Sequence, residues 1–152
     1  MSKSVKRVEQ AARELGLAIT VQRMPETTRT AAQAAAACGC AVGQIVKSLI
    51  FAGAESGQLK LLLVSGAHDV DLANAKQLFG EDLVRADPKQ VRDTTGFAIG
   101  GVAPIGHLTP LEAWFDRRLL AHASVWAAAG APNAVFEITP QALADASNAA
   151  LF

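Results

Sequence analysis

Lys47 stands alone as a charged residue in the apolar segment Ile45 to Phe51. The segment is rich in β-branched and large apolar residues and is predicted to form a strand. In a strand, Lys47 would share one face with Ile45, Leu49 and Phe51, and Ser48 would lie on the opposite face. A lysine in such a place either extends its ammonium group to solvent at the strand's edge or projects it into a pocket that needs a positive charge. The position within the strand leaves both interpretations open.

The second candidate is the glycine-rich and largely apolar segment from Gly96 to His107. Its adjacent residues Gly100 and Gly101 would let the backbone approach a ligand closely and direct N–H groups at developing negative charge. The glycine spacing matches neither a dinucleotide-binding fingerprint nor a phosphate-binding loop. A tight turn or bulge between strands explains the two glycines equally well.

The other nucleophilic and metal-binding residue types form no recognisable catalytic set. The histidines, at positions 68, 107 and 122, lack metal-ligand spacing, and no serine lies in a nucleophile-elbow pattern. Cys38 and Cys40 are separated by one residue, which fits small-residue packing better than a disulfide or a zinc site. We therefore expect no metal and no cofactor, and His107 is kept as a candidate pocket residue.

Basic residues are dispersed, and the 14 lysines and arginines balance 14 acidic residues. A net charge of zero argues against a protein that coats nucleic acid, although it allows one that grips a single nucleic-acid end. Lys3, Lys6 and Arg7 are expected on the solvated face of a first helix. Arg23 and Arg29 flank a loop that leads toward the segment of Lys47.

Helical and strand patterns interleave without regular βαβ spacing, which predicts an α+β fold with a mixed sheet in one domain, residues 1–152. Helices are predicted from Ser4 to Leu15, from the capping box at Thr30 to near Gly39, from Asp71 to Phe79, from Asp87 through Asp93, and from Thr139 nearly to Phe152. Strands are predicted over Ala18–Met24, Ile45–Phe51, Leu59–Val64, Glu112–Phe115, Ser124–Ala128 and Ala134–Ile138. No apolar stretch approaches the ~20 residues that span a bilayer, and the N-terminus lacks a signal-peptide pattern, so a cytoplasmic location is expected.

In this order and context, the motifs resemble the prolyl-tRNA editing family. That family includes free-standing Cys-tRNA(Pro) deacylases and the editing domain inserted in bacterial prolyl-tRNA synthetases. The resemblance runs from end to end of the chain. It is carried by the alanine-rich helix followed by Gln44–Phe51, by Ala86-Asp87-Pro88, and by Thr94–His107 with its Gly-Gly-x-x-Pro-x-Gly pattern.

The resemblance implies a barrel-like mixed sheet with surrounding helices and a cleft for the aminoacylated 3′ end of a tRNA. The implied reaction is hydrolysis of the ester that joins a wrong amino acid to the terminal ribose. Lys47 would orient the substrate, and the amides of Gly100 and Gly101 would hold the carbonyl as it becomes an oxyanion. Water would be the nucleophile, with a ribose hydroxyl helping to activate it.

The resemblance also implies further substrate contacts, and these positions differ most from the family's pattern. The further substrate-binding candidates are Met24, Thr30, Ser48, Ile99, Pro104 and His107. Deacylases of this family tend to carry aromatic residues where this chain has Met24 and Thr30, and Val135 replaces an acidic pocket residue. The removed amino acid is therefore left open among cysteine, alanine, serine and threonine on tRNA(Pro).

Three other functions compete with this one. A non-catalytic tRNA- or synthetase-binding module of the same fold has the same sequence features. A Schiff-base enzyme built on Lys47 lacks a phosphate cradle for pyridoxal phosphate, and a DNA-binding protein would need a basic recognition face. The expected partners are a tRNA 3′ end and prolyl-tRNA synthetase, with no membrane and no DNA, for a monomer or homodimer.

Overall fold

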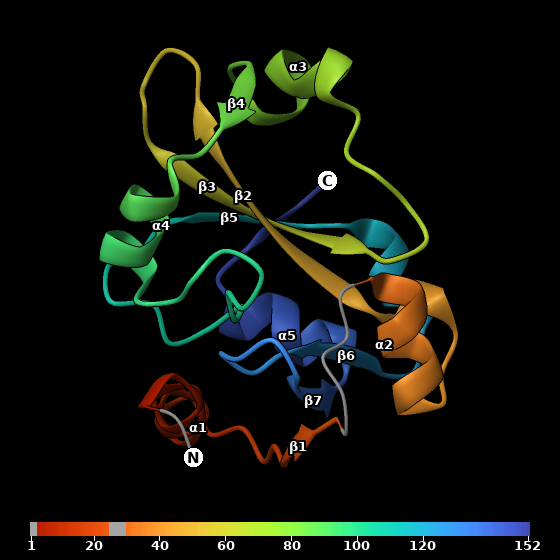
Figure 1. Cartoon of the computed structure of the whole chain (residues 1–152). Helices are drawn as coiled ribbons and strands as arrows, with labels where there is room; N and C mark the ends of the chain where they lie inside the picture. The colour runs from red at the N-terminus through yellow and green to blue at the C-terminus, as the bar shows by residue number, and fades with distance from the viewer. Residues whose placement is uncertain (1–2, 25–29) are drawn as a thin grey trace.

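The computed structural model describes residues 3–24 and 30–152, which form two β-sheets with helices around them (Figure 1). The helices are α1 (Lys3–Glu14), α2 (Ala31–Cys38), α3 (Ala75–Phe79), α4 (Pro88–Thr95) and α5 (Pro140–Ala146). The strands are β1 (Val21–Arg23), β2 (Val46–Gly53), β3 (Leu59–Ser65), β4 (Leu83–Arg85), β5 (Glu112–Phe115), β6 (Val125–Ala128), β7 (Ala134–Ile138) and β8 (Ala150–Leu151). Short 3₁₀ helices cover Val42–Gln44, Leu72–Asn74 and Arg117–Ala121.

The larger sheet has the order β4-β2-β3-β5-β8, and the smaller has the order β1-β7-β6. In the larger sheet, β5 runs parallel to both β3 and β8, and the remaining pairs are antiparallel. A single parallel bridge between Ile45 and Trp126 joins the two sheets just before β2 begins. The α+β class with a mixed sheet is thus confirmed. The described strands form two sheets rather than a closed ring, so the barrel-like form is not confirmed.

Strand β3 is the centre of the packing because every one of its residues is buried. Leu61 and Leu63 pack into a core with Phe115 and Phe136, which joins the two sheets. Leu62 faces the other way, into a second core under α3. A strand covered on both faces has a continuous apolar run instead of alternation, and the sequence Leu59–Val64 has this form apart from Lys60.

The helix ends follow the capping signals in the sequence. Thr30 and Gln33 form the predicted capping box at the start of α2, and Gly39 ends that helix in the left-handed conformation. Asp87 caps α4 by accepting a hydrogen bond from the N–H of Lys89. None of the described helices has the length and apolar character that crossing a bilayer requires.

Several predicted boundaries were wrong. The strand predicted over Ala18–Met24 is only Val21–Arg23, because these three residues alone pair with β7. The last helix stops at Ala146, where the Ser147 hydroxyl donates to the carbonyl of Leu143 and Asn148 takes a positive φ of 53°.

The residues after that helix form β8, which pairs with β5. The three-residue strand β4 was not predicted, and the segment after Asp71 begins as a 3₁₀ turn before α3. Short edge strands are too brief to leave a periodic signal in the sequence.

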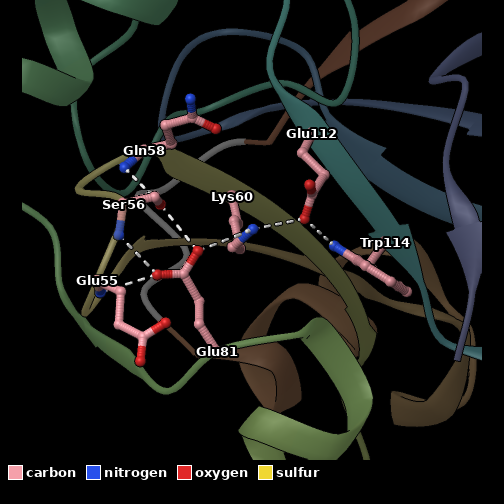
Figure 2. A network of polar contacts seen from close by, with 7 residues as sticks. All are labelled: Glu55, Ser56, Gln58, Lys60, Glu81, Glu112 and Trp114. Carbon is pink, nitrogen blue, oxygen red and sulfur yellow. Dashed lines mark hydrogen bonds and ion pairs between the residues drawn. The ribbon is translucent and has the colours of Figure 1, made fainter.

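Lys60 interrupts the apolar run of β3 and is 4% exposed, so its charge needs partners. Its Nζ lies 2.7 Å from Glu112 Oε2 and 3.7 Å from Glu81 Oε2 (Figure 2). Glu81 also accepts hydrogen bonds from the N–H groups of Glu55 and Ser56 and from the Ser56 hydroxyl. The bonds from Ser56 and Glu55, helped by the charge of Lys60, lower the pKa of Glu81 to about 2. This network closes the turn between β2 and β3 far along the strands from Lys47.

Replacing Glu81 with glutamine should make the stability of the fold less dependent on pH in acid. The lowered pKa of Glu81 means that the unfolded chain takes up a proton below pH 4.5, whereas the folded chain does so only near pH 2. The stabilisation is therefore complete above pH 4.5 and is lost as the pH falls to about 2. Urea unfolding at several pH values should give a shallower acid loss for Glu81→Gln than for the wild type. Glu55→Gln is the control, because Glu55 contacts Glu81 through its backbone N–H; equal acid slopes for all three proteins would contradict the prediction.

Candidate active site

A cavity of about 270 Å³ lies where the start of β2 meets β6, the hairpin between β6 and β7, helix α2 and the glycine segment. Its walls are mostly small and apolar, with only two polar side chains from β2 and one from the start of α2. The lining residues are Thr30, Ala31, Ala34, Ile45, Val46, Lys47, Ser48, Leu49, Gly100, Val102, Trp126, Ala127, Ala128, Ala131, Pro132, Ala134 and Val135. Lys47 and Gly100, 53 positions apart in the sequence, are thus brought to one cavity.

Lys47 lines this cavity, and its side chain is 25% exposed. Its ammonium group donates a hydrogen bond to the backbone carbonyl of His68 and lies 3.2 Å from Asp69 Oδ1. Both acceptors belong to the loop that follows β3, the strand that pairs with β2 beside Lys47. An ammonium group has three donors, and two have acceptors here. The ammonium group is therefore held against the loop after β3 rather than extended freely into solvent.

The Ser48 hydroxyl is a buried polar group without a partner. Ser48 follows Lys47 on the strand and points to the opposite face of the sheet. Within the described residues, its Oγ is the one buried side-chain nitrogen or oxygen that makes no hydrogen bond. Leaving such a group unsatisfied costs about 1–3 kcal/mol. Because Ser48 lines the cavity, a bound ligand could supply the missing partner.

The two adjacent glycines have different backbone roles. The N–H of Gly101 donates to the carbonyl of Ala98 at 2.9 Å, which closes a turn. Gly100 is at the tip of that turn with φ +94°, a conformation that favours glycine. Neither Gly100 nor Val102 donates its N–H to any residue in the described part of the chain. Of the two glycines, Gly100 is therefore the one whose N–H has no acceptor within the described residues, and it shares this with Val102.

Arg7 of α1 holds both ends of the glycine segment. Its side chain donates to the carbonyl of Gly106 at 3.0 Å and to the carbonyl of Gly96 at 2.7 Å. The guanidinium group also lies 4.6 Å from the ring centroid of Phe97. Arg7 was expected to face solvent, and that expectation is wrong. Arg7 of the first helix therefore fixes a loop that begins 89 positions later in the sequence.

The structure brings some of the predicted substrate-binding residues to the cavity. Thr30 lines it, and its Oγ1 accepts the capping hydrogen bond from Gln33 N at 3.1 Å. Ile99 is 53% exposed and lines an adjoining hollow. Met24 is buried behind the cavity, in a cluster with the lining residues Trp126 and Val135.

Pro104 and His107 lie away from the cavity. Pro104 is buried, and His107 donates from Nε2 to the carbonyl of Ala103 at 2.7 Å with its ring against Phe97. Burial lowers the pKa of His107 below its usual value, and the nearby charge of Arg7 adds to the effect. Arg23 contacts Asn133 at 3.4 Å, and Arg29 lies outside the described residues.

Sequence patterns did not reveal the far wall of the cavity. It consists of Trp126, Ala127 and Ala128 on β6 with Ala131 and Pro132 in the following turn. Small apolar residues in a predicted strand give no sign of which pocket they line. Only the bridge between Ile45 and Trp126, a tertiary contact, places this strand opposite β2.

The described lining residues include Lys47, the hydroxyl residues Thr30 and Ser48, and the backbone of Gly100, but no cysteine, histidine or carboxylate that could act as a nucleophile or general base. Cys38, near the end of α2, is a poor nucleophile because burial, with the charges of Cys40 and Glu137, raises the pKa of its thiol to about 11. Within residues 3–24 and 30–152, no three His, Cys, Asp or Glu side chains are grouped as metal ligands would be. Such a site can neutralise and hydrogen-bond a developing oxyanion, and the attacking group would come from water or from the substrate.

Removing the unpartnered hydroxyl should not destabilise the fold. Ser48→Ala should leave the free energy of unfolding unchanged or raise it by up to about 1 kcal/mol, because an unsatisfied buried group is lost. Ser65→Ala is the matched control, since the buried Ser65 hydroxyl donates to the carbonyl of Gly43 at 2.9 Å. That variant should lose about 1–2 kcal/mol. Urea unfolding of both would decide, and a larger loss for Ser48→Ala than for Ser65→Ala would show that Ser48 has a structural partner.

Comparison with known proteins places this chain in a family. A sequence model of the aminoacyl-tRNA editing domain matches residues 25–146. The uncharacterised protein YwhH of Bacillus subtilis (strain 168) is 33% identical over 127 residues, which cover 84% of this chain and 80% of that protein.

Solved structures agree with the sequence match. A crystal structure of a proposed trans-editing enzyme for prolyl tRNA synthetase is 48% identical, with a TM-score of 0.92 over 100% of this chain and 96% of that one. The hypothetical protein APE2540 is 30% identical, with a TM-score of 0.85 over 95% of this chain and 96% of that one. The resemblance inferred from Lys47 and the glycine segment is thereby confirmed, and the chain belongs to the aminoacyl-tRNA editing domain family.

Proposed function

We propose that this protein is a trans-editing deacylase that hydrolyses the ester bond of a mischarged tRNA in the cytoplasm. The observation that carries the proposal is that Lys47, Ser48 and Gly100 line one cavity, and that the Ser48 hydroxyl and the Gly100 N–H make no hydrogen bond within the described residues. An ester carbonyl that turns into an oxyanion requires donors of this kind. The relationship to a proposed trans-editing enzyme for prolyl tRNA synthetase favours tRNA(Pro) as the substrate and the synthetase as a partner.

The reaction begins when a water oxygen adds to the ester carbonyl carbon. The carbonyl oxygen gains a negative charge, which the Gly100 N–H stabilises by hydrogen bonding, while the Lys47 ammonium group reduces the local charge. The water proton passes to the ribose oxygen as the ester C–O bond breaks, with the neighbouring ribose hydroxyl as the relay. The products are the free amino acid and the uncharged tRNA. No side chain of the protein needs to change its covalent state.

The shape of the cavity favours a small amino acid. Six of the lining residues are alanines, from α2, β6, β7 and the turn between β6 and β7: Ala31, Ala34, Ala127, Ala128, Ala131 and Ala134. None of the described lining residues is acidic, and the apolar Val135 is among them. Such walls suit uncharged side chains of the size of alanine, cysteine, serine or threonine, which we propose as the removed residues.

The proposal predicts that the purified protein hydrolyses at least one member of a panel of Cys-, Ala-, Ser- and Thr-tRNA(Pro). Lys47→Ala should lower the rate by roughly 10²- to 10³-fold, as loss of one charge-stabilising donor does elsewhere. Lys89→Ala, which removes an exposed lysine paired only with Asp93, is the control and should be fully active. The measurement is the loss of labelled aminoacyl-tRNA with time. Decay of the whole panel at the uncatalysed rate would leave a non-catalytic binding module as the better description.

A second prediction concerns the backbone of Gly100. Gly100→Ala meets no neighbouring atom but is strained by φ +94°, so the turn should shift and the N–H of residue 100 should lose its alignment. Gly57→Ala is the matched control, because Gly57 also has a positive φ of +70° and open space around it. Both variants should lose about 1–2 kcal/mol of stability, whereas only Gly100→Ala should lose deacylase activity in the same assay. Equal activities would show that Gly100 has no role in the reaction.

A further inference from the structure

A second hollow of about 310 Å³ adjoins the cavity on the side of β4. It is lined by Ser48, Leu49, Ile50, Phe51, Arg85, Ala86, Ile99, Gly100 and Val102. Four of these residues, Ser48, Leu49, Gly100 and Val102, also line the first cavity. The two hollows are therefore neighbours that share a boundary, and the unpartnered Ser48 hydroxyl and the Gly100 turn lie on that boundary.

The second hollow differs from the first in chemistry. Its lining residues include larger apolar residues, with Ile99 exposed at the tip of the glycine turn. Its one charged lining residue is Arg85, an exposed residue of the edge strand β4. Apolar surface next to an arginine suits a nucleotide, since a base packs against apolar side chains and the guanidinium group attracts phosphate.

We infer that this second hollow binds the 3′-terminal nucleobase of the tRNA, while the alanine-lined cavity takes the amino acid. The inference rests on the proposed deacylase function and adds an assignment of the two halves of the substrate. An aminoacyl nucleoside has its ribose and ester between the base and the amino acid. With the halves placed in this way, the ribose and ester lie at the shared boundary, where the Ser48 hydroxyl and the Gly100 N–H have no partner within the described part of the chain.

The opposite placement fits the charges less well. The rest of the tRNA is a polyanion that continues from the base, so it needs cations on the base side. Arg85, which lines the second hollow, makes no ion pair within the described residues. In the first cavity, Lys47 is the one described cationic lining residue, and it already contacts Asp69 and the His68 carbonyl.

The test uses two probes that lack an amino acid: the trinucleotide CpCpA and a matched trinucleotide whose terminal residue has no base. Binding is measured by NMR titration of the full-length protein at fixed low salt. The wild type should bind CpCpA roughly tenfold more tightly than the abasic probe, the effect expected when one base is withdrawn from water against apolar side chains. Ile99→Ala should remove most of this difference. Arg85→Gln should weaken both probes to a similar extent, because it removes a phosphate contact.

Two matched variants separate the hollows. Arg92→Ala removes an exposed arginine of α4 that lines neither hollow, and it should keep the preference for CpCpA. Ala128→Val narrows only the first cavity, so it should keep trinucleotide binding while lowering deacylation.

The outcomes distinguish this inference from the proposed deacylase function. Equal binding of the two probes, or a base preference unchanged in Ile99→Ala, would overturn the assignment of the base even if the wild type deacylates mischarged tRNA. Unchanged binding in Arg85→Gln would overturn the phosphate contact. A base preference that depends on Ile99, found in a protein without deacylase activity, would support the nucleobase site and reject the proposed reaction.

Discussion

The buried carboxylate of Asp116 fixes the backbone on which the candidate site is built. Asp116 is 1% exposed and accepts hydrogen bonds from the N–H of Ser65, at the end of β3, and from the backbone and side chain of Arg118. Burial alone would raise the pKa of Asp116, but these hydrogen bonds and the charge of Arg118 outweigh it and lower the pKa. The charged form is therefore the stable one, and it holds the end of β3 in place.

The start of β2 depends on that end of β3. Val46 pairs with Ser65 and Lys47 pairs with Val64, while the Ser65 hydroxyl donates to the carbonyl of Gly43. Gly66 donates to the carbonyl of Ile45, and a Cβ at Gly66 would lie 2.6 Å from the carbonyl oxygen of Val42. The backbone at the start of β2 is thus packed so closely against Gly66 that a side chain at position 66 would not fit. A slip of one residue would move Lys47 to the face of Ser48 and destroy the site.

The sequence was most informative where local chemistry decides the structure. The capping box at Thr30, the proline at the start of α4 and the apolar run of β3 depend on neighbouring residues, and their elements were predicted closely. Lys47 and Gly100 could be singled out because a charge in an apolar strand and a pair of glycines are locally unusual. The different roles of Gly100 and Gly101 could not be predicted, because the hydrogen bond from Gly101 to Ala98 depends on the shape of the turn.

Contacts between distant segments account for what the sequence did not reveal. Arg7 looks like a surface residue of an amphipathic helix, and only the fold brings it to the carbonyls of Gly96 and Gly106. Strand β8 exists because β5 offers a free edge to the end of the chain. The wall formed by Ala127 and Ala128 faces Lys47 only because the two sheets meet at Ile45 and Trp126.

Buried polar groups are of two kinds in this structure. Most have hydrogen-bond or ion-pair partners and stabilise the fold, whereas the Ser48 hydroxyl has none within the described residues and is a candidate for ligand binding. Lys60 is buried between Glu81 and Glu112, and Glu81 is further satisfied by three hydrogen bonds from the β2–β3 turn. Asp116 is satisfied in the same manner. The Ser48 hydroxyl is equally shielded from water but has no partner, although an alanine there would avoid the cost of about 1–3 kcal/mol. The buried charged groups in the described part of the fold are satisfied, so the unpaired Ser48 hydroxyl is an exception. Its place on the boundary between the two hollows suggests a role in binding. Its partner is then expected to arrive with the ligand, and the cost borne by the free protein is recovered when the substrate binds.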